Sequence, residues 1–241
     1  MAICMKICQS FLNLFFSKMT SKLIIISGID GSGKSTNIDI IKDYFLKRKL
    51  RIISIWTRGG YSPGFLFIKS IFRIIFGKKL LPSGYSKKRK KILKNNFVSN
   101  LWINLAIIDL IFFWGFYLRA KMYFMDIIIC DRYILDTLID FKINFGNINL
   151  ESNLLWKLLN ILTPRPDSSF ILKIPFPESQ RRLNFKVEPF PDKFEYAKYR
   201  YELYEKYFSN SYYKNIDSSL DIKIVSKNIC SEISKLINYK T

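Results

Sequence analysis

The chain has 241 residues, 49% of them hydrophobic, and a formal net charge of +20. Its length and apolar content suit one globular domain with insertions. The absence of histidine excludes acid–base catalysis and metal ligation by that residue. The four cysteines lack C-x-x-C spacing, so we expect neither a disulfide framework nor a zinc site, and a reducing cytoplasm fits best.

The positive charge is concentrated in one part of the chain. The stretch between Asp43 and Asp109 is rich in Lys and Arg and contains no acidic residue. Such a field favours polyanionic partners, which include nucleotides, nucleic acids and anionic membrane surfaces. A solvated basic face is the alternative, and we predict no specific nucleic acid partner.

Residues 1–20 precede the first predicted strand and form an N-terminal extension, with the folded domain at 21–241. The extension mixes apolar residues with Lys6 and Lys18. We expect an amphipathic helix that lies on the domain or on a membrane, rather than a signal peptide. Met19 is a second candidate for the first residue.

A phosphate-binding loop follows the first strand. Leu23 to Ile26 are four consecutive aliphatic residues, typical of a buried parallel strand, and the pattern G-x-x-x-x-G-K-S begins at Gly28. Its glycines let backbone N–H groups surround a phosphate, and the following helix N-terminus adds positive potential. Lys34, expected to be exposed, would contact the β- and γ-phosphates, and Ser35 would ligate Mg²⁺. The predicted nucleotide contacts are Gly28, Asp30, Gly31, Ser32, Gly33, Lys34, Ser35 and Thr36.

Strands and helices alternate along the rest of the chain, which favours a parallel sheet covered on both faces. We therefore predict an α/β fold: a P-loop three-layer α/β/α sandwich with a five-stranded parallel sheet and a helical lid. The further strands are expected at Arg51–Trp56, Asp126–Cys130, Ser169–Ile174 and Tyr213–Asp217, and the helices at Ser35–Arg48, Leu101–Leu118, 152–162, Pro177–Phe185, Asp192–Phe208 (with Asp192 as N-cap) and Ile222–Ile237.

Two stretches allow a membrane interpretation. The basic segment 61–100 resembles an insertion, either a helix with a solvated loop or a basic–apolar surface for lipid headgroups. Leu101–Leu118 is long and apolar, but Asp109 at its centre would cost about 2.5–3.5 kcal/mol in a bilayer. We therefore interpret Leu101–Leu118 as a core helix.

Arginines follow several of the predicted strands, at the sheet edge where ligands of α/β proteins bind. Arg58 follows the second strand, Arg132 follows the third, and Arg181 and Arg182 follow the fourth. The guanine-reading N-K-x-D motif of GTPases is absent. Phosphoryl transfer between two anionic substrates needs such cations, so the pattern favours a small-molecule kinase.

Four motifs together resemble the thymidylate kinase family over residues 22–238. They are I-x-G-x-D-G-x-G-K-S-T at Ile26–Thr36, T-R-x-G at Thr57–Gly60, D-R-Y at Asp131–Tyr133 and D-K-F-E at Asp192–Glu195. Ile129–Asp140 is also similar to the thymidylate-kinase-like proteins of cell-surface polysaccharide gene clusters.

The resemblance implies ATP- and Mg²⁺-dependent phosphoryl transfer to a nucleoside monophosphate, with dTMP converted to dTDP. It implies that Asp30 approaches the acceptor sugar and that Arg58 and Arg132 hold the acceptor phosphate. Asp131 would help to position Mg²⁺. The implied catalytic residues are Asp30, Lys34, Arg132 and Arg182; the implied acceptor contacts are Asp30, Arg58, Arg132 and Tyr133; and the implied lid, 178–195, contributes Arg181, Arg182 and Lys186 over the ATP phosphates.

Three departures from the family pattern leave the acceptor open. Leu110 stands where an arginine is usual, the motif after the second strand is shortened, and Lys173 replaces a common aspartate. The alternatives are a kinase for a sugar or lipid-linked phosphate, and a non-enzymatic ATP-binding protein. A homodimer and an anionic membrane surface stay open as partners, the latter at the inner membrane face.

Overall fold

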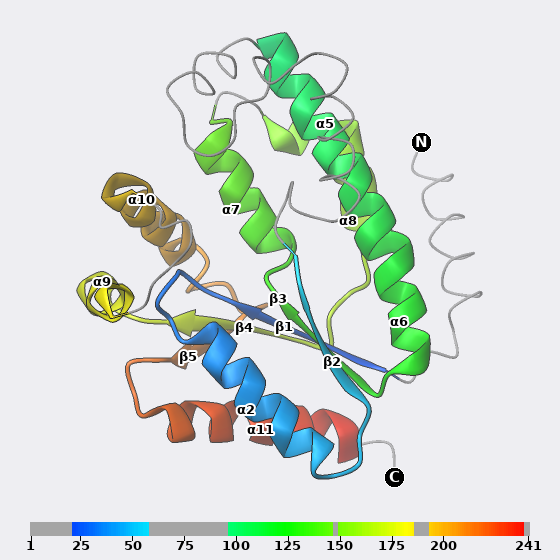
Figure 1. Ribbon diagram of the computed structural model, residues 1–241. Coiled ribbons are helices and arrows are strands. Elements are labelled where there is room, and N and C mark those ends of the chain that lie inside the picture. Colours follow the sequence, from blue (N-terminus) through cyan, green and yellow to red (C-terminus); the bar gives the residue numbers. More distant parts are fainter. Residues whose placement is uncertain (1–20, 58–95, 147–148, 186–192, 239–241) are drawn as a thin grey trace.

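The computed structural model describes residues 21–57, 96–146, 149–185 and 193–238 (Figure 1). Its centre is one five-stranded sheet in which all strands are parallel, in the order β2-β3-β1-β4-β5. The predicted five-stranded parallel sheet is thereby confirmed. The strands are β1 (Lys22–Ser27), β2 (Ile52–Trp56), β3 (Ile127–Asp131), β4 (Ser168–Lys173) and β5 (Lys214–Asp217).

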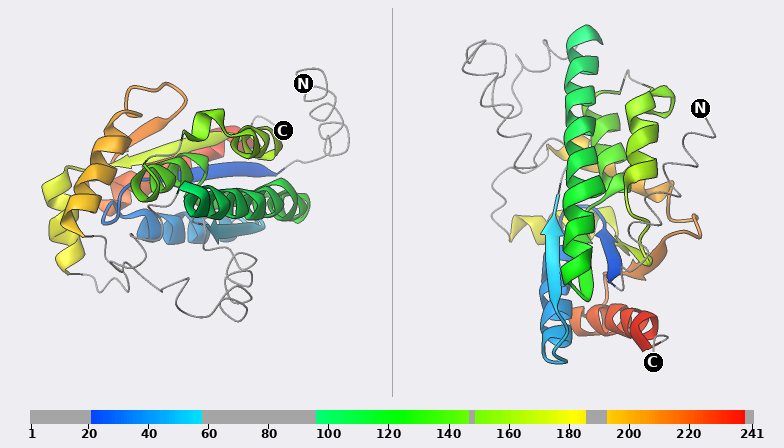
Figure 2. Two further views of the ribbon diagram at one scale, coloured as in Figure 1. Left: turned by 90° about the horizontal axis from the view of Figure 1, so that it is seen from above. Right: turned by 90° about the vertical axis from the view of Figure 1, so that its right-hand side faces the viewer.

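Helices cover both faces of the sheet, so the predicted three-layer sandwich is also confirmed (Figures 1 and 2). The helices are α2 (Lys34–Leu46), α5 (Asn96–Phe112), η1 (Phe113–Leu118), α6 (Arg119–Phe124), α7 (Ile134–Asn144), η2 (Leu150–Ser152), α8 (Leu154–Leu162), α9 (Phe176–Asn184), α10 (Phe194–Glu205) and α11 (Ile222–Asn238). Helices α2 and α11 cover one face, and the helical segment 96–124 and α8 cover the other, whereas α9 and α10 lie toward the carboxyl ends of the strands.

Strand β1 explains why the sheet needs two helical layers. Leu23 and Ile25 point into the core beneath α5 and α8, whereas Ile24 and Ile26 pack against α2 and α11. All four side chains are buried, as expected for a strand inside a parallel sheet. Because helices cover both faces of the sheet, the polar groups of the loop after β1 lie at the carboxyl edge of the sheet.

The long apolar stretch forms one helical segment through α5, the π-helical η1 and α6. By length and composition, Val98–Phe124 is the one helix in the described part of the chain that could cross a membrane. Its inner face packs on the sheet through fully buried side chains at helical spacing, as predicted for a core helix. These are Ile103, Ile107, Leu110, Trp114 and Leu118.

The structure differs from the predicted elements at several places. The long helical segment runs from Asn96 to Phe124, beyond both ends of the predicted Leu101–Leu118. Helix α7 was not predicted, although Leu135, Leu138 and Ile139 have helical spacing. Helix α10 begins at Phe194 with Lys193 as its N-cap, whereas Asp192 lies outside the described residues. The N-terminal extension and most of the basic segment 61–100 also lie outside them.

Candidate active site

The loop between β1 and α2 has the backbone that a phosphate-binding loop needs. Gly28, Gly31 and Gly33 all have positive φ angles, of 149°, 80° and 81°. At Gly31 there is also no space for a side chain, because a Cβ would lie 2.6 Å from the Ser179 carbonyl oxygen of α9. Glycine at this position therefore lets the loop pack directly against α9.

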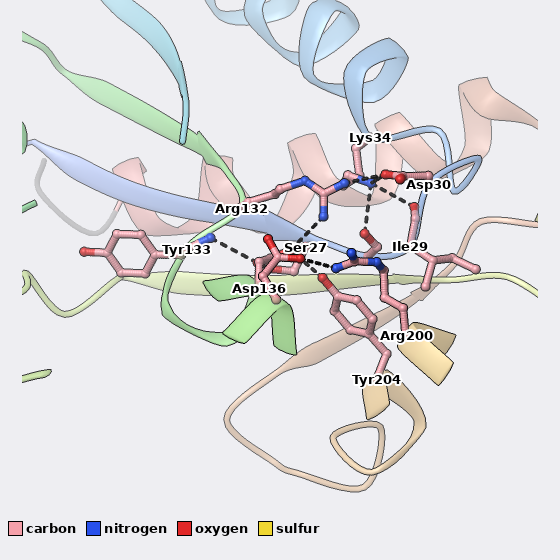
Figure 3. A network of polar contacts seen from close by, with 11 residues as sticks. Ser27, Ile29, Asp30, Lys34, Arg132, Tyr133, Asp136, Arg200 and Tyr204 are labelled. Atoms are coloured by element: carbon pink, nitrogen blue, oxygen red, sulfur yellow. Dashed lines mark hydrogen bonds and ion pairs between the residues drawn. The ribbon is translucent and has the colours of Figure 1, made fainter. Parts of the chain in front are cut away.

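Lys34, the first residue of α2, turns back into this loop. Its ammonium donates hydrogen bonds to the carbonyl oxygens of Gly28 (2.9 Å) and Ile29 (2.8 Å) and lies 3.9 Å from Asp30 Oδ1 (Figure 3). The residue is only 7% exposed, so the expectation of an exposed Lys34 is wrong. Burial, and next the charge of Arg132, lowers the pKa of Lys34 to about 8.

The other residues of the P-loop pattern differ in their exposure to solvent. Ser32 Oγ is buried and has no hydrogen-bond partner among the residues that the structure describes. Ser35 and Thr36 are exposed in the first turn of α2. The Ser35 hydroxyl is therefore accessible to a ligand that approaches the start of the helix.

Asp131 ends β3, beside the loop. Its Oδ1 is buried and accepts no hydrogen bond from any described residue, and burial raises the pKa of its carboxyl group. The described residues contain no group of three or more Asp, Glu, His or Cys that is arranged to hold a metal ion by itself. One carboxylate and one hydroxyl nevertheless fit Mg²⁺, which usually takes few protein ligands together with phosphate oxygens and water.

Arg132 connects β3 to the loop after β1. The residue is 5% exposed, and its Nη2 donates to Asp30, while Nη1 lies 3.7 Å from Asp136 Oδ1. Burial acts to lower the pKa of the guanidinium, but Asp30 and further negative groups around it raise this pKa well above its usual value. A permanent positive charge is therefore held next to Asp30 and near Lys34.

Asp136 of α7 lies beneath this cation and joins several elements. Its Oδ2 accepts hydrogen bonds from Ser27 Oγ (2.6 Å) and from the Tyr133 backbone N–H (3.0 Å), and its Oδ1 accepts one from the Tyr204 hydroxyl of α10 (Figure 3). Only 1% of Asp136 is exposed. Asp136 was not among the predicted site residues, although a carboxylate three residues after the N-cap of a helix is a known capping signal.

Tyr133 and the two arginines of the implied lid make their contacts away from the other predicted site residues. The Tyr133 hydroxyl donates to the Pro164 carbonyl oxygen, and its ring packs on Trp114, so it does not join the other predicted acceptor contacts (Figure 3). Although Tyr133 directly follows Arg132 in the sequence, the two side chains point to different places. Arg181 and Arg182 both pair with Glu178, and Arg182 also donates to the Ser218 carbonyl oxygen.

The structure thus brings Asp30, Lys34, Asp131 and Arg132 together at the carboxyl edge of the sheet. The predicted contacts Arg58 and Lys186 lie outside the described residues. Thr57, which precedes Arg58, donates its N–H to the Asp131 carbonyl oxygen at 3.4 Å. A P-loop on a five-stranded parallel sheet, with further cations at the adjoining strand end, is the arrangement expected of a P-loop kinase.

Comparisons with known proteins agree with this class. A thymidylate kinase of Plasmodium falciparum is 24% identical over 224 residues, 91% of this chain and 92% of that protein. A probable thymidylate kinase of Saccharolobus solfataricus is 28% identical over 86% of this chain and 98% of its own length. One from Desulfotalea psychrophila is 25% identical over 92% of this chain and 98% of its own length.

No family model matches the chain. The three relatives nevertheless span nearly the whole protein, and they agree with the resemblance carried by the sequence motifs. The chain is therefore similar to thymidylate kinases over nearly its whole length, and it is a P-loop enzyme of the nucleoside monophosphate kinase type.

Proposed function

We propose that this enzyme transfers the γ-phosphoryl group of ATP to thymidylate, giving ADP and dTDP. A phosphate oxygen of the acceptor attacks the γ-phosphorus, and the bond from that phosphorus to the β-phosphate oxygen breaks. The observation that carries the proposal is the pairing of two buried cations around Asp30. Lys34 belongs to the P-loop, and Arg132 comes from the neighbouring strand end, so each is placed to serve a different anionic substrate.

The chain's own residues have distinct proposed roles. The loop from Gly28 to Thr36 would surround the ATP phosphates, with Lys34 at the oxygens where negative charge develops. Arg132 would hold the acceptor phosphate together with Arg58, and Asp30 would approach the acceptor sugar. Lid contacts from Arg181, Arg182 and Lys186 require the first two to leave Glu178.

Ser35 and Asp131 would hold Mg²⁺, because one offers an exposed hydroxyl and the other a carboxylate oxygen that accepts no hydrogen bond from the described residues. A bound Mg²⁺ would neutralise charge on the phosphates. These substrates imply a cytoplasmic enzyme. The kinase for a sugar or lipid-linked acceptor and the non-enzymatic ATP-binding protein gain no support from the comparisons.

The acceptor is tested by direct phosphoryl transfer. With ATP and Mg²⁺, we expect conversion of dTMP to dTDP, separated by chromatography, to exceed that of dCMP, dGMP and dAMP. The control omits the acceptor and so measures ATP hydrolysis alone. Transfer to none of the nucleoside monophosphates by a protein that still binds ATP would contradict the proposal.

We further propose that two copies of the chain associate through the outer face of the long helix. Phe112, Phe116 and Tyr123 lie along this face and are each more than half exposed. The face has few charges among the described residues, because Arg119 donates to Leu162 and Lys121 lies over the Tyr117 ring. An apolar face of this kind suits a second copy of the protein better than an anionic membrane surface.

Sedimentation velocity tests this contact. A variant with Phe112→Glu and Phe116→Glu should dissociate at least about 100-fold more readily, because each buried phenylalanine contributes about 1.5–3 kcal/mol. Leu154→Glu, at an exposed leucine of α8, is the matched control and should leave the dimer intact. A wild-type monomer that binds anionic vesicles in a salt-sensitive manner would instead favour the membrane.

A further inference from the structure

Asp136 connects Arg132, the predicted cation for the acceptor phosphate, to the rest of the fold. Both of its oxygens are occupied: Oδ2 by Ser27 of β1 and the Tyr133 backbone, and Oδ1 by Tyr204 of α10. The same Oδ1 lies 3.7 Å from Arg132 Nη1. A carboxylate bonded from several sides can move little, and an arginine that faces it has few orientations available.

Arg132 itself is held by two carboxylates, one at each terminal nitrogen of its guanidinium. Asp30, on the loop, pairs with Nη2, and Asp136, on α7, lies beside Nη1. Arg132 Nη1 is buried and makes no hydrogen bond within the described part of the chain. Asp30 belongs to the substrate-facing loop, whereas Asp136 is covered by the fold, so Asp136 can keep orienting Arg132 when a substrate anion engages the Asp30 side.

Helix α10 adds a second buried pair one turn away. Arg200 pairs with Asp140 of α7, and both side chains are almost completely buried. The partners are spaced by four residues on each helix, so Tyr204–Asp136 and Arg200–Asp140 lie side by side between antiparallel helices. Figure 3 shows Tyr204 and Arg200 reaching from α10 toward this cluster. The position of Asp136 is therefore tied to α10 as well as to β1.

We propose that Asp136 is a positioning residue: it fixes the Arg132 guanidinium for the acceptor phosphate and links it to helix α10 through Tyr204. The proposal rests on the proposed function, in which Arg132 contacts the acceptor. Asp136 itself contacts neither substrate. It acts through Arg132, so its removal should affect the acceptor and leave ATP binding almost unchanged.

Asp136→Asn tests this role, since the amide keeps the size of the side chain and removes its charge. We expect the KM for the acceptor to rise at least about tenfold and the Kd for ATP to change less than about twofold. Tyr204→Phe removes one hydroxyl only and should raise the same KM by about threefold. Tyr199→Phe, at an exposed tyrosine of the same helix, is the matched control and should change neither value.

A double variant separates positioning from general stability. In an Arg132→Lys background, Asp136→Asn should add little to the rise in acceptor KM, because both changes remove the same contact. Independent, multiplicative effects would overturn the proposal. So would equal losses of ATP and acceptor affinity in a folded Asp136→Asn protein. If that variant does not fold, an acceptor KM unchanged in Tyr204→Phe would overturn it too.

The NMR signals of the arginine side chains give a readout that needs no acceptor. In the wild-type protein, the Arg132 guanidinium should rotate slowly, and this restraint should be lost in Asp136→Asn and weakened in Tyr204→Phe. An unchanged guanidinium in both variants would overturn the inference even if the enzyme phosphorylates thymidylate. Conversely, a lost restraint in a protein that phosphorylates no nucleoside monophosphate would refute only the proposed function.

Discussion

Replacing Lys34 with alanine should lower the rate of phosphoryl transfer by about 10³-fold or more. The ammonium is the P-loop cation, and it would stabilise charge that develops on the transferring phosphoryl group. Its hydrogen bonds to the Gly28 and Ile29 carbonyl oxygens place it inside the loop, where low exposure strengthens its electrostatic effect. Single-turnover kinetics at saturating ATP and acceptor measure the loss.

The same substitution should also reduce stability, contrary to what an exposed lysine would imply. Two buried carbonyl oxygens lose their donor, at a cost of about 1–3 kcal/mol each, partly offset because a buried charge is removed. Lys34→Met keeps the aliphatic stem and is the matched variant, and urea unfolding measures both. Near-normal turnover by a folded Lys34→Met protein would remove the P-loop from the mechanism.

A pH titration gives this prediction a second readout. The folded pKa of Lys34 is about 8, below its usual value, so the free protein loses this charge as the pH rises through 8. ATP affinity should therefore fall above pH 8 in the wild type, and this fall should be absent in Lys34→Met. Between pH 8 and the ordinary lysine pKa, the folded state binds fewer protons than the unfolded state, so Lys34 makes stability rise with pH there.

The layered fold followed from local patterns in the sequence. The run of aliphatic residues in β1 can be buried only between two layers, and the glycine-rich loop marks where the strand ends. Helix α7 was not predicted, although the sequence contains the signals for it. Its apolar spacing at Leu135 and Ile139 was present in the sequence, and so was the capping carboxylate of Asp136.

The polar network beneath the site could not be predicted from such patterns. Asp136 meets Ser27 across 109 positions of the chain and Tyr204 across 68, so only the packing of α7 against β1 and α10 brings them together. The burial of Lys34 has the same origin, because the carbonyl oxygens that surround it depend on the loop conformation. The direction of the Tyr133 side chain was likewise not predictable, because adjacency to Arg132 does not determine where a side chain points.

Arg132→Ala is expected to have the largest combined effect on acceptor binding and stability. Its loss removes a charge-assisted contact to the acceptor phosphate, worth about 1.5–3 kcal/mol, or about 10- to 150-fold in acceptor affinity. It also leaves the carboxylates of Asp30 and Asp136 without their shared buried cation. Breaking such a buried pair typically costs about 3–5 kcal/mol of folding free energy.

Arg132→Lys separates the two effects, because it retains the charge and loses the fork that reaches two carboxylates at once. It should recover part of the stability, measured by urea unfolding, and little of the acceptor affinity, measured by calorimetry. Arg51→Ala is the matched control: Arg51 pairs with Asp126 at the surface, where an ion pair contributes little to stability. If Arg132→Lys lost ATP affinity as strongly as acceptor affinity, Arg132 would belong to the ATP phosphates. The two cations around Asp30 would then serve one substrate, and the acceptor phosphate would need another arginine.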